Sequence, residues 1–137
     1  MNNTEQQIFL NLFLKPKAEL SENQRSILLN LLAKVEDNLH YSKKHIYISL
    51  LEDYLSNKIT TMDFVYSFMG IYEEIGSKTR TKKASDLMDY LQPSRSDLGE
   101  LLAKIYGECD HFEEDNPSAL FDEMQLKQYV QQLMSKL

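Results

Sequence analysis

Apolar side chains recur along this chain at intervals of three and four residues, and this spacing constrains the fold more than any other feature. A period near 3.6 places such residues on one face of an α-helix, whereas a half-buried strand needs strict alternation, which is missing here. Four glycines and three prolines in 137 residues are too few for an all-β protein with many tight turns. We therefore predict an all-α fold, a compact single-domain bundle of about six helices.

Capping residues mark where several of these helices begin. Ser21 with Gln24 forms a capping box before the apolar stripe of residues 28–39. Thr60 with Asp63 resembles a second capping box, with Asp in place of Glu. Asp122 is expected to cap the last helix, which runs from about residue 122 to residue 137.

Other residues predict where helices end. Asn57 follows a helix expected over residues 43–56, and Gly76 can supply the C-terminal turn of the next one. Residues 77–83 are polar and basic without apolar anchors, so we predict a mobile loop there. No repeat or linker divides residues 1–137, and we expect residues 1–42 to form an N-terminal helical extension to a bundle of residues 43–137.

The net charge of −6 is unevenly distributed along the sequence. Residues 84–137 contain four basic and eleven acidic side chains, whereas the rest of the chain is nearly neutral. A protein that binds phosphates needs a basic face, so we expect no direct contact with nucleic acid. The charge favours a basic protein as partner, although acidic residues of this kind also serve simply to keep a protein soluble.

The usual catalytic and metal-binding patterns are absent from the sequence. The three histidines do not form metal-ligand pairs, and we expect them to be structural or surface residues. Cys109 is the single cysteine, and we predict that it is a small core residue. The acidic segment does not match a calcium-binding EF-hand loop. Whether the loop is taken to begin at Glu108 or at Asp110, its sixth position is not the glycine that the motif requires. We expect no enzyme, no cofactor and no metal.

No signal peptide or membrane span precedes or interrupts the helices, so a cytoplasmic location and no membrane partner are expected.

The segment of residues 108–123 contains seven acidic side chains and no lysine or arginine. Its central acids follow the expected end of a helix, where the macrodipole disfavours negative charge by about 0.3–1 kcal/mol each. This cost favours a binding role over a purely solubilising one. Phe112, in the middle of the acids, is either an anchor to the core or an interface aromatic.

Three blocks of the chain resemble one family. They are residues 51–64 (LEDYLSNKITTMDF), residues 101–115 (LLAKIYGECDHFEED) and the last helix, with its Leu-x-x-Leu spacing. In order and spacing, residues 49–137 resemble the colicin D immunity protein family of bacterial, self-protective, colicin-like immunity proteins. Residues 1–42 have no counterpart in it, and chains with such extensions look like immunity members of contact-dependent growth-inhibition systems.

The resemblance implies a function and a set of site residues. Family members are small helical bundles that bind the tRNA-cleaving domain of a cognate toxin and cover its basic active site with acids, as a tRNA mimic. Asp110, Glu113 and Asp115 fall on acidic positions of the family motif, whereas Glu108 and Glu114 are included only because they lie beside them. We therefore expect an immunity protein, or antitoxin, whose partner is a basic nuclease domain. The alternative is a helical adaptor that binds a helix of another protein through the apolar residues 8–14.

Overall fold

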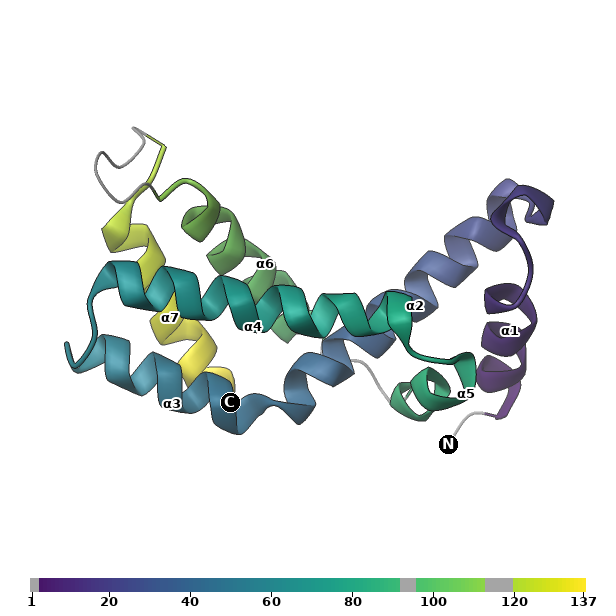
Figure 1. Cartoon of the computed structure of the whole chain (residues 1–137), viewed down its shortest axis with the longest axis horizontal. Coiled ribbons are helices and arrows are strands. Elements are labelled where there is room, and N and C mark those ends of the chain that lie inside the picture. Colours follow the sequence, from purple (N-terminus) through teal and green to yellow (C-terminus); the bar gives the residue numbers. More distant parts are fainter. Residues whose placement is uncertain (1–2, 92–95, 113–119) are drawn as a thin grey trace. The chain divides into compact units, whose positions relative to one another are not determined.

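A computed structural model of the chain describes residues 3–91, 96–112 and 120–137, and in these ranges every regular element is a helix (Figure 1). The elements are α1 (Asn3–Phe13), η1 (Lys17–Glu19), α2 (Glu22–Ser42), α3 (Lys44–Leu55), α4 (Thr61–Thr81), α5 (Ala84–Leu87), η2 (Met88–Tyr90), α6 (Ser96–Asp110) and α7 (Glu123–Lys136). The predicted all-α fold is confirmed, with seven α-helices in the described part of the chain where about six were expected. None of these helices is long and apolar enough to span a membrane.

The chain forms two compact units. Unit 1 comprises Met1–Ser42 and Ile75–Ser96, and unit 2 comprises Lys43–Glu74 and Asp97–Leu137. The expected boundary after residue 42 coincides with one of these divisions, but unit 1 also takes in a second segment of the chain. Unit 1 contains nine Lys and Arg residues against seven acids, and unit 2 contains six against fourteen. The negative charge of the protein therefore belongs to unit 2.

Unit 1 is assembled from the apolar faces of α1 and α2 and from the short helices α5 and η2. Phe9 and Leu12 of α1 are buried, as are Val35 of α2 and Leu87 of α5. The Asn38 side-chain amide donates to the carbonyl oxygen of Tyr90 over 2.7 Å, which ties α2 to η2. Phe9 and Leu12 of the stripe over residues 8–14 are thus buried in this unit, whereas Ile8 and Leu14 are 39% and 72% exposed.

Unit 2 is built around a row of aromatic rings. Tyr54 of α3 stacks on Phe64 of α4 with ring centroids 4.3 Å apart. Phe64 continues to Phe68 at 5.7 Å and Phe68 to Tyr72 at 6.1 Å, along one face of α4. Tyr72 then stacks on Tyr106 of α6 at 4.6 Å. Aliphatic residues of α6 and α7, among them the fully buried Leu102, Ile105, Leu126 and Val130, complete this core.

The loop predicted over residues 77–83 is wrong for residues 77–81, because α4 continues to Thr81, and only residues 82 and 83 connect α4 to α5. Gly76 lies within the helix and supplies no left-handed turn. The hydroxyl groups of Thr79 and Thr81 donate to carbonyl oxygens three and four residues earlier, which satisfies polar groups of the last turns. Lys78 and Arg80 lie in the last turn, where positive charge is favourable to the helix dipole. These local interactions allow a polar segment without apolar anchors to remain helical.

The predicted helix ends around Ser21, Asn57 and Asp122 are confirmed. The backbone N–H of Ser21 donates to Gln24 Oε1, and the N–H of Gln24 donates to Ser21 Oγ, as a capping box requires. Asn57 ends α3 in the left-handed region with φ of 62°. The N–H of Lys58 then reaches the carbonyl of Asp53, which is the Schellman arrangement of a helix end.

The left-handed backbone of Asn57 leads to a first prediction. Asn57→Ala should lower the free energy of unfolding by about 1 kcal/mol, because a Cβ without a compensating polar group is disfavoured at positive φ. Asn57→Gly should leave the free energy unchanged or raise it. Urea denaturation followed by circular dichroism measures both variants, and equal destabilisation by Ala and Gly would contradict the assignment.

Candidate protein-binding surface

The five acids singled out in the sequence fall into two groups. Glu108 and Asp110 lie in the last turn of α6 and can be placed. Glu113, Glu114 and Asp115 lie outside the residues that the structure describes. The candidate surface is therefore built from the end of α6 and the start of α7.

Glu108 holds these two helix ends together. Its Oε2 accepts a hydrogen bond from the backbone N–H of Asp122 over 3.2 Å. The carboxylate of Asp122 in turn accepts from the N–H of Gln125 over 3.1 Å and caps α7, as predicted. Glu108 and Asp122 therefore satisfy backbone donors, so their first role is to position the start of α7.

Asp110 differs from Glu108 because its side chain is exposed and points along the face of α6 that carries Tyr106 one turn earlier. The Tyr106 hydroxyl donates to Glu73 Oε1 of α4 over 2.6 Å. This hydrogen bond is the largest of the causes that raise the pKa of Tyr106 to about 12, and burial and the negative charges of Glu73 and Asp110 add to it. The negative charges of Asp110 and Glu73 thus both raise the pKa of the Tyr106 hydroxyl.

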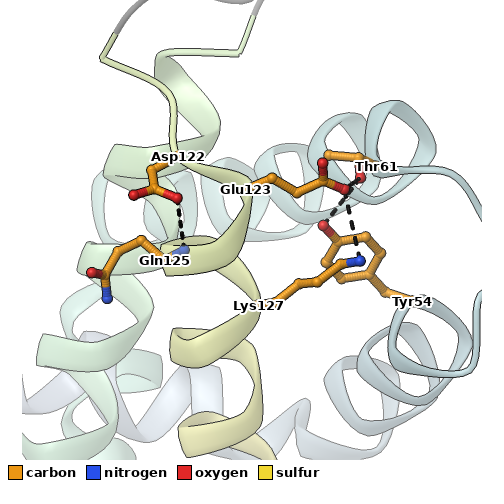
Figure 2. A network of polar contacts seen from close by, with 6 residues as sticks. All are labelled: Tyr54, Thr61, Asp122, Glu123, Gln125 and Lys127. Atoms are coloured by element: carbon orange, nitrogen blue, oxygen red, sulfur yellow. Dashed lines mark hydrogen bonds and ion pairs between the residues drawn. The ribbon is translucent and has the colours of Figure 1, made fainter.

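A polar network anchors the start of α7 to α3 and α4 (Figure 2). The Thr61 hydroxyl donates to Glu123 Oε1 over 2.6 Å, so the Tyr54 hydroxyl, 3.1 Å from Thr61 Oγ1, must be the donor to Thr61. The Lys127 ammonium lies 3.8 Å from the Glu123 carboxylate and 5.6 Å from the centre of the Tyr54 ring. Burial is the main cause that raises the pKa of Tyr54. This network ties the first turn of α7 to α3 and α4.

Two exposed apolar side chains lie beside the acids. Leu120 is 68% exposed and Met124 is 76% exposed, and Asp122 and Glu123 lie between them in the sequence. We name Asp110, Leu120, Asp122, Glu123 and Met124 the α6–α7 surface. Apolar residues rimmed by charged ones are typical of a protein-binding surface.

The sequence reasoning did not single out Leu120 and Met124. Both fall outside the apolar stripe of Leu126, Val130 and Leu133, which is buried. For Met124, the available signal was an apolar residue off the stripe of an amphipathic helix, whereas Leu120 precedes α7 and carried no such signal. Phe112, assigned either to the core or to an interface, is partly exposed and packs edge-on against Phe121 with ring centroids 5.2 Å apart.

Cys109, His40 and His45 have different surroundings. Burial, with a smaller contribution from the charge of Glu108, raises the pKa of the Cys109 thiol to about 12, so the sulfur is protonated at neutral pH and is a poor nucleophile. His40 is buried, with Nε2 3.6 Å from the Glu36 carboxylate, and His45 is exposed. The residues that can be placed contain no cluster of three potential metal ligands.

Comparison with known proteins adds no relative to these observations. No protein-family model matches the chain, and neither a curated protein nor a solved structure is significantly similar to it. The function must therefore be inferred from the surface itself.

The different positions of Glu108 and Asp110 lead to a second prediction. Glu108→Ala should lower the free energy of unfolding by about 0.5–1.5 kcal/mol, because the N–H of Asp122 loses its acceptor. Asp110→Ala should change it by less than about 0.5 kcal/mol, since the side chain is exposed. Urea denaturation of the two variants provides the comparison, and a larger loss for Asp110→Ala would show that the roles are reversed.

The Tyr106–Glu73 hydrogen bond leads to a third prediction. In the unfolded chain tyrosine ionises near pH 10, so the bond contributes to stability below about pH 10 and loses that contribution as the pH rises towards about 12. Glu73→Gln should lower the pKa of Tyr106, and Asp110→Asn should lower it by less. These shifts are measured by absorbance titration at the tyrosinate band. The titration of a protein that also carries Tyr106→Phe is subtracted from that of each variant, which leaves the signal of Tyr106 alone. A pKa of Tyr106 that does not move in Glu73→Gln would contradict the assignment.

Proposed function

We propose that this protein is an immunity protein, or antitoxin, of the colicin D immunity type that neutralises a cognate tRNA-cleaving bacterial toxin. It acts in the cytoplasm by binding the nuclease domain and covering its basic active site with an acidic patch. The observation that supports this proposal most directly is the α6–α7 surface, where the exposed acids Asp122 and Glu123 lie between the exposed Leu120 and Met124 in the sequence.

The charge distribution supports a basic protein as the partner. Unit 2 contains fourteen acids against six Lys and Arg residues, so its field repels phosphates and attracts cationic surfaces. A nuclease must offer cationic groups to the RNA backbone, and carboxylates held in place can occupy the same positions. The exposed apolar residues give such a contact the desolvated centre that affinity requires.

The proposal assigns different tasks to the individual acids. Asp110 is exposed and available to a cation of the toxin. The proposal assigns Glu113, Glu114 and Asp115, which lie outside the described residues, to the same contact. Glu108 and Glu123 contribute by holding the start of α7, because they bind the N–H of Asp122 and the hydroxyl of Thr61. Inhibition requires binding only, so the protein needs neither catalysis nor a cofactor for this task.

Charge reversal at one exposed acid gives the fourth prediction. Asp110→Lys should weaken toxin binding by about 2 kcal/mol or more, because a favourable contact with the nuclease becomes repulsive. Glu52→Lys is the matched control, since Glu52 is an exposed acid of α3 and the change in net charge is identical. Binding is measured by surface plasmon resonance with the nuclease encoded beside this protein, and inhibition by cleavage of tRNA. Equal losses for the two variants would show that only net charge matters.

The family-derived acids are tested together in the same assay. Reversing both Asp110 and Asp115 should abolish protection of tRNA, whereas Lys136→Ala should leave it intact. Protection that survives the double reversal would refute the acidic-patch mechanism. A neighbouring gene without a toxin would favour the alternative, a helical adaptor.

A further inference from the structure

Unit 1 carries an apolar groove that has no part in the proposed acidic surface. Two adjoining hollows, of about 330 Å³ and about 180 Å³, share Lys17, Leu28 and Leu32 as lining residues. Phe13, from the end of α1, lines the larger hollow, and Leu20 lines the smaller one. Leu28 and Leu32 are four residues apart on α2, so they lie on one face and form a continuous apolar floor.

The charged residues that line the groove are all cationic. Lys15, Lys17 and Arg80 line the larger hollow, and Lys17 and Arg25 line the smaller one. None of the described residues that line either hollow is acidic. The guanidinium of Arg25 donates to the carbonyl oxygen of Lys17 over 3.1 Å, which fixes part of this rim. The rim of the groove is therefore positively charged, although unit 1 as a whole is close to neutral.

Apolar surface extends beyond the hollows. Leu29, which lines the smaller hollow, is 66% exposed, and Leu14, between the lining residues Phe13 and Lys15, is 72% exposed. A leucine side chain left in water is less stable than one that is buried against apolar surface. A small-molecule site would enclose most of its ligand, whereas here the lining residues Lys15, Lys17 and Arg25 are themselves exposed. The groove is thus better suited to a larger element that covers it from outside.

We propose that this groove binds an amphipathic helix of a partner protein whose apolar stripe is flanked by aspartate or glutamate. The lining residues of α2 from Arg25 to Leu32 extend over eight residues, or about 10 Å along the helix, which matches apolar anchors at i, i+3, i+4 and i+7 of a docked helix. The carboxylates of that helix would meet the cationic rim formed by Lys15, Lys17, Arg25 and Arg80. This binding site shares no residue with the α6–α7 surface and does not depend on the proposed function.

The test uses a synthetic helical peptide about 15 residues long, with leucine at the four anchor positions and glutamate on both sides of the stripe. A matched peptide carries lysine in place of every glutamate. Fluorescence anisotropy with the full-length protein should show binding of the glutamate peptide at least about tenfold tighter than that of the lysine peptide, with the difference shrinking at high salt.

Two exposed positions report on the groove without disturbing the core. Leu29→Glu and Lys15→Glu should each weaken binding of the glutamate peptide at least about tenfold, because one removes apolar contact and the other reverses the charge of the rim. Their matched controls are Ile46→Glu and Lys58→Glu, at an exposed apolar and an exposed basic position of unit 2 outside the α6–α7 surface. Both controls should bind the peptide as the unchanged protein does, and circular dichroism verifies the folding of all four.

Several outcomes would overturn the proposal. They are no binding of the glutamate peptide, equal binding of the two peptides, or binding that Leu29→Glu leaves unchanged. Self-association in sedimentation that Leu29→Glu abolishes, without peptide binding, would assign the groove to a second copy of this chain. Binding to phosphatidylglycerol vesicles without peptide binding would assign it to an anionic lipid surface.

Discussion

Stacked aromatic rings connect three helices of unit 2, and the positions of its functional groups depend on them. The row begins at Tyr54 of α3, follows α4 through Phe64 and Phe68, and reaches Tyr106 of α6 through Tyr72. Rings at these separations attract one another and bury large apolar areas, so they favour the packing in which α3, α4 and α6 bring these rings together. The rotation of α6 then determines which of its acids face other helices and which face solvent.

The acids near the end of α6 illustrate this division of tasks. Glu108 and Glu123 are occupied by hydrogen bonds from Asp122 and Thr61, whereas Asp110 remains exposed near a helix end that disfavours negative charge. The helix dipole makes the negative charge of this carboxylate unfavourable, and a cationic group of a partner would offset that unfavourable interaction. The groove of unit 1 has the opposite character, with lysine and arginine around apolar residues. The protein therefore presents two chemically distinct surfaces, and both are suited to protein partners.

The sequence alone predicted the features that depend on neighbouring residues. The period of the apolar residues predicted the all-α fold, and the capping residues Ser21 and Asp122 marked helix starts that the structure confirms. Asn57 likewise marked the end of α3. Such signals are readable because the interacting groups are at most five residues apart, so the chain itself brings them together. The acids of the candidate surface were also recognisable as a group, because their excess is a property of composition.

Only the tertiary structure decided what each acid does and where polar segments are helical. Glu108 reaches the N–H of Asp122 across fourteen residues, and Tyr106 reaches Glu73 across thirty-three. The exposure of Leu120 and Met124 and the cationic groove of unit 1 likewise depend on which helices pack together. Residues 77–81 were expected to form a loop, and the structure shows them within α4. Sequence periodicity identifies the apolar face of a helix, but partners that are distant in the sequence determine which polar groups are satisfied and which remain available for binding.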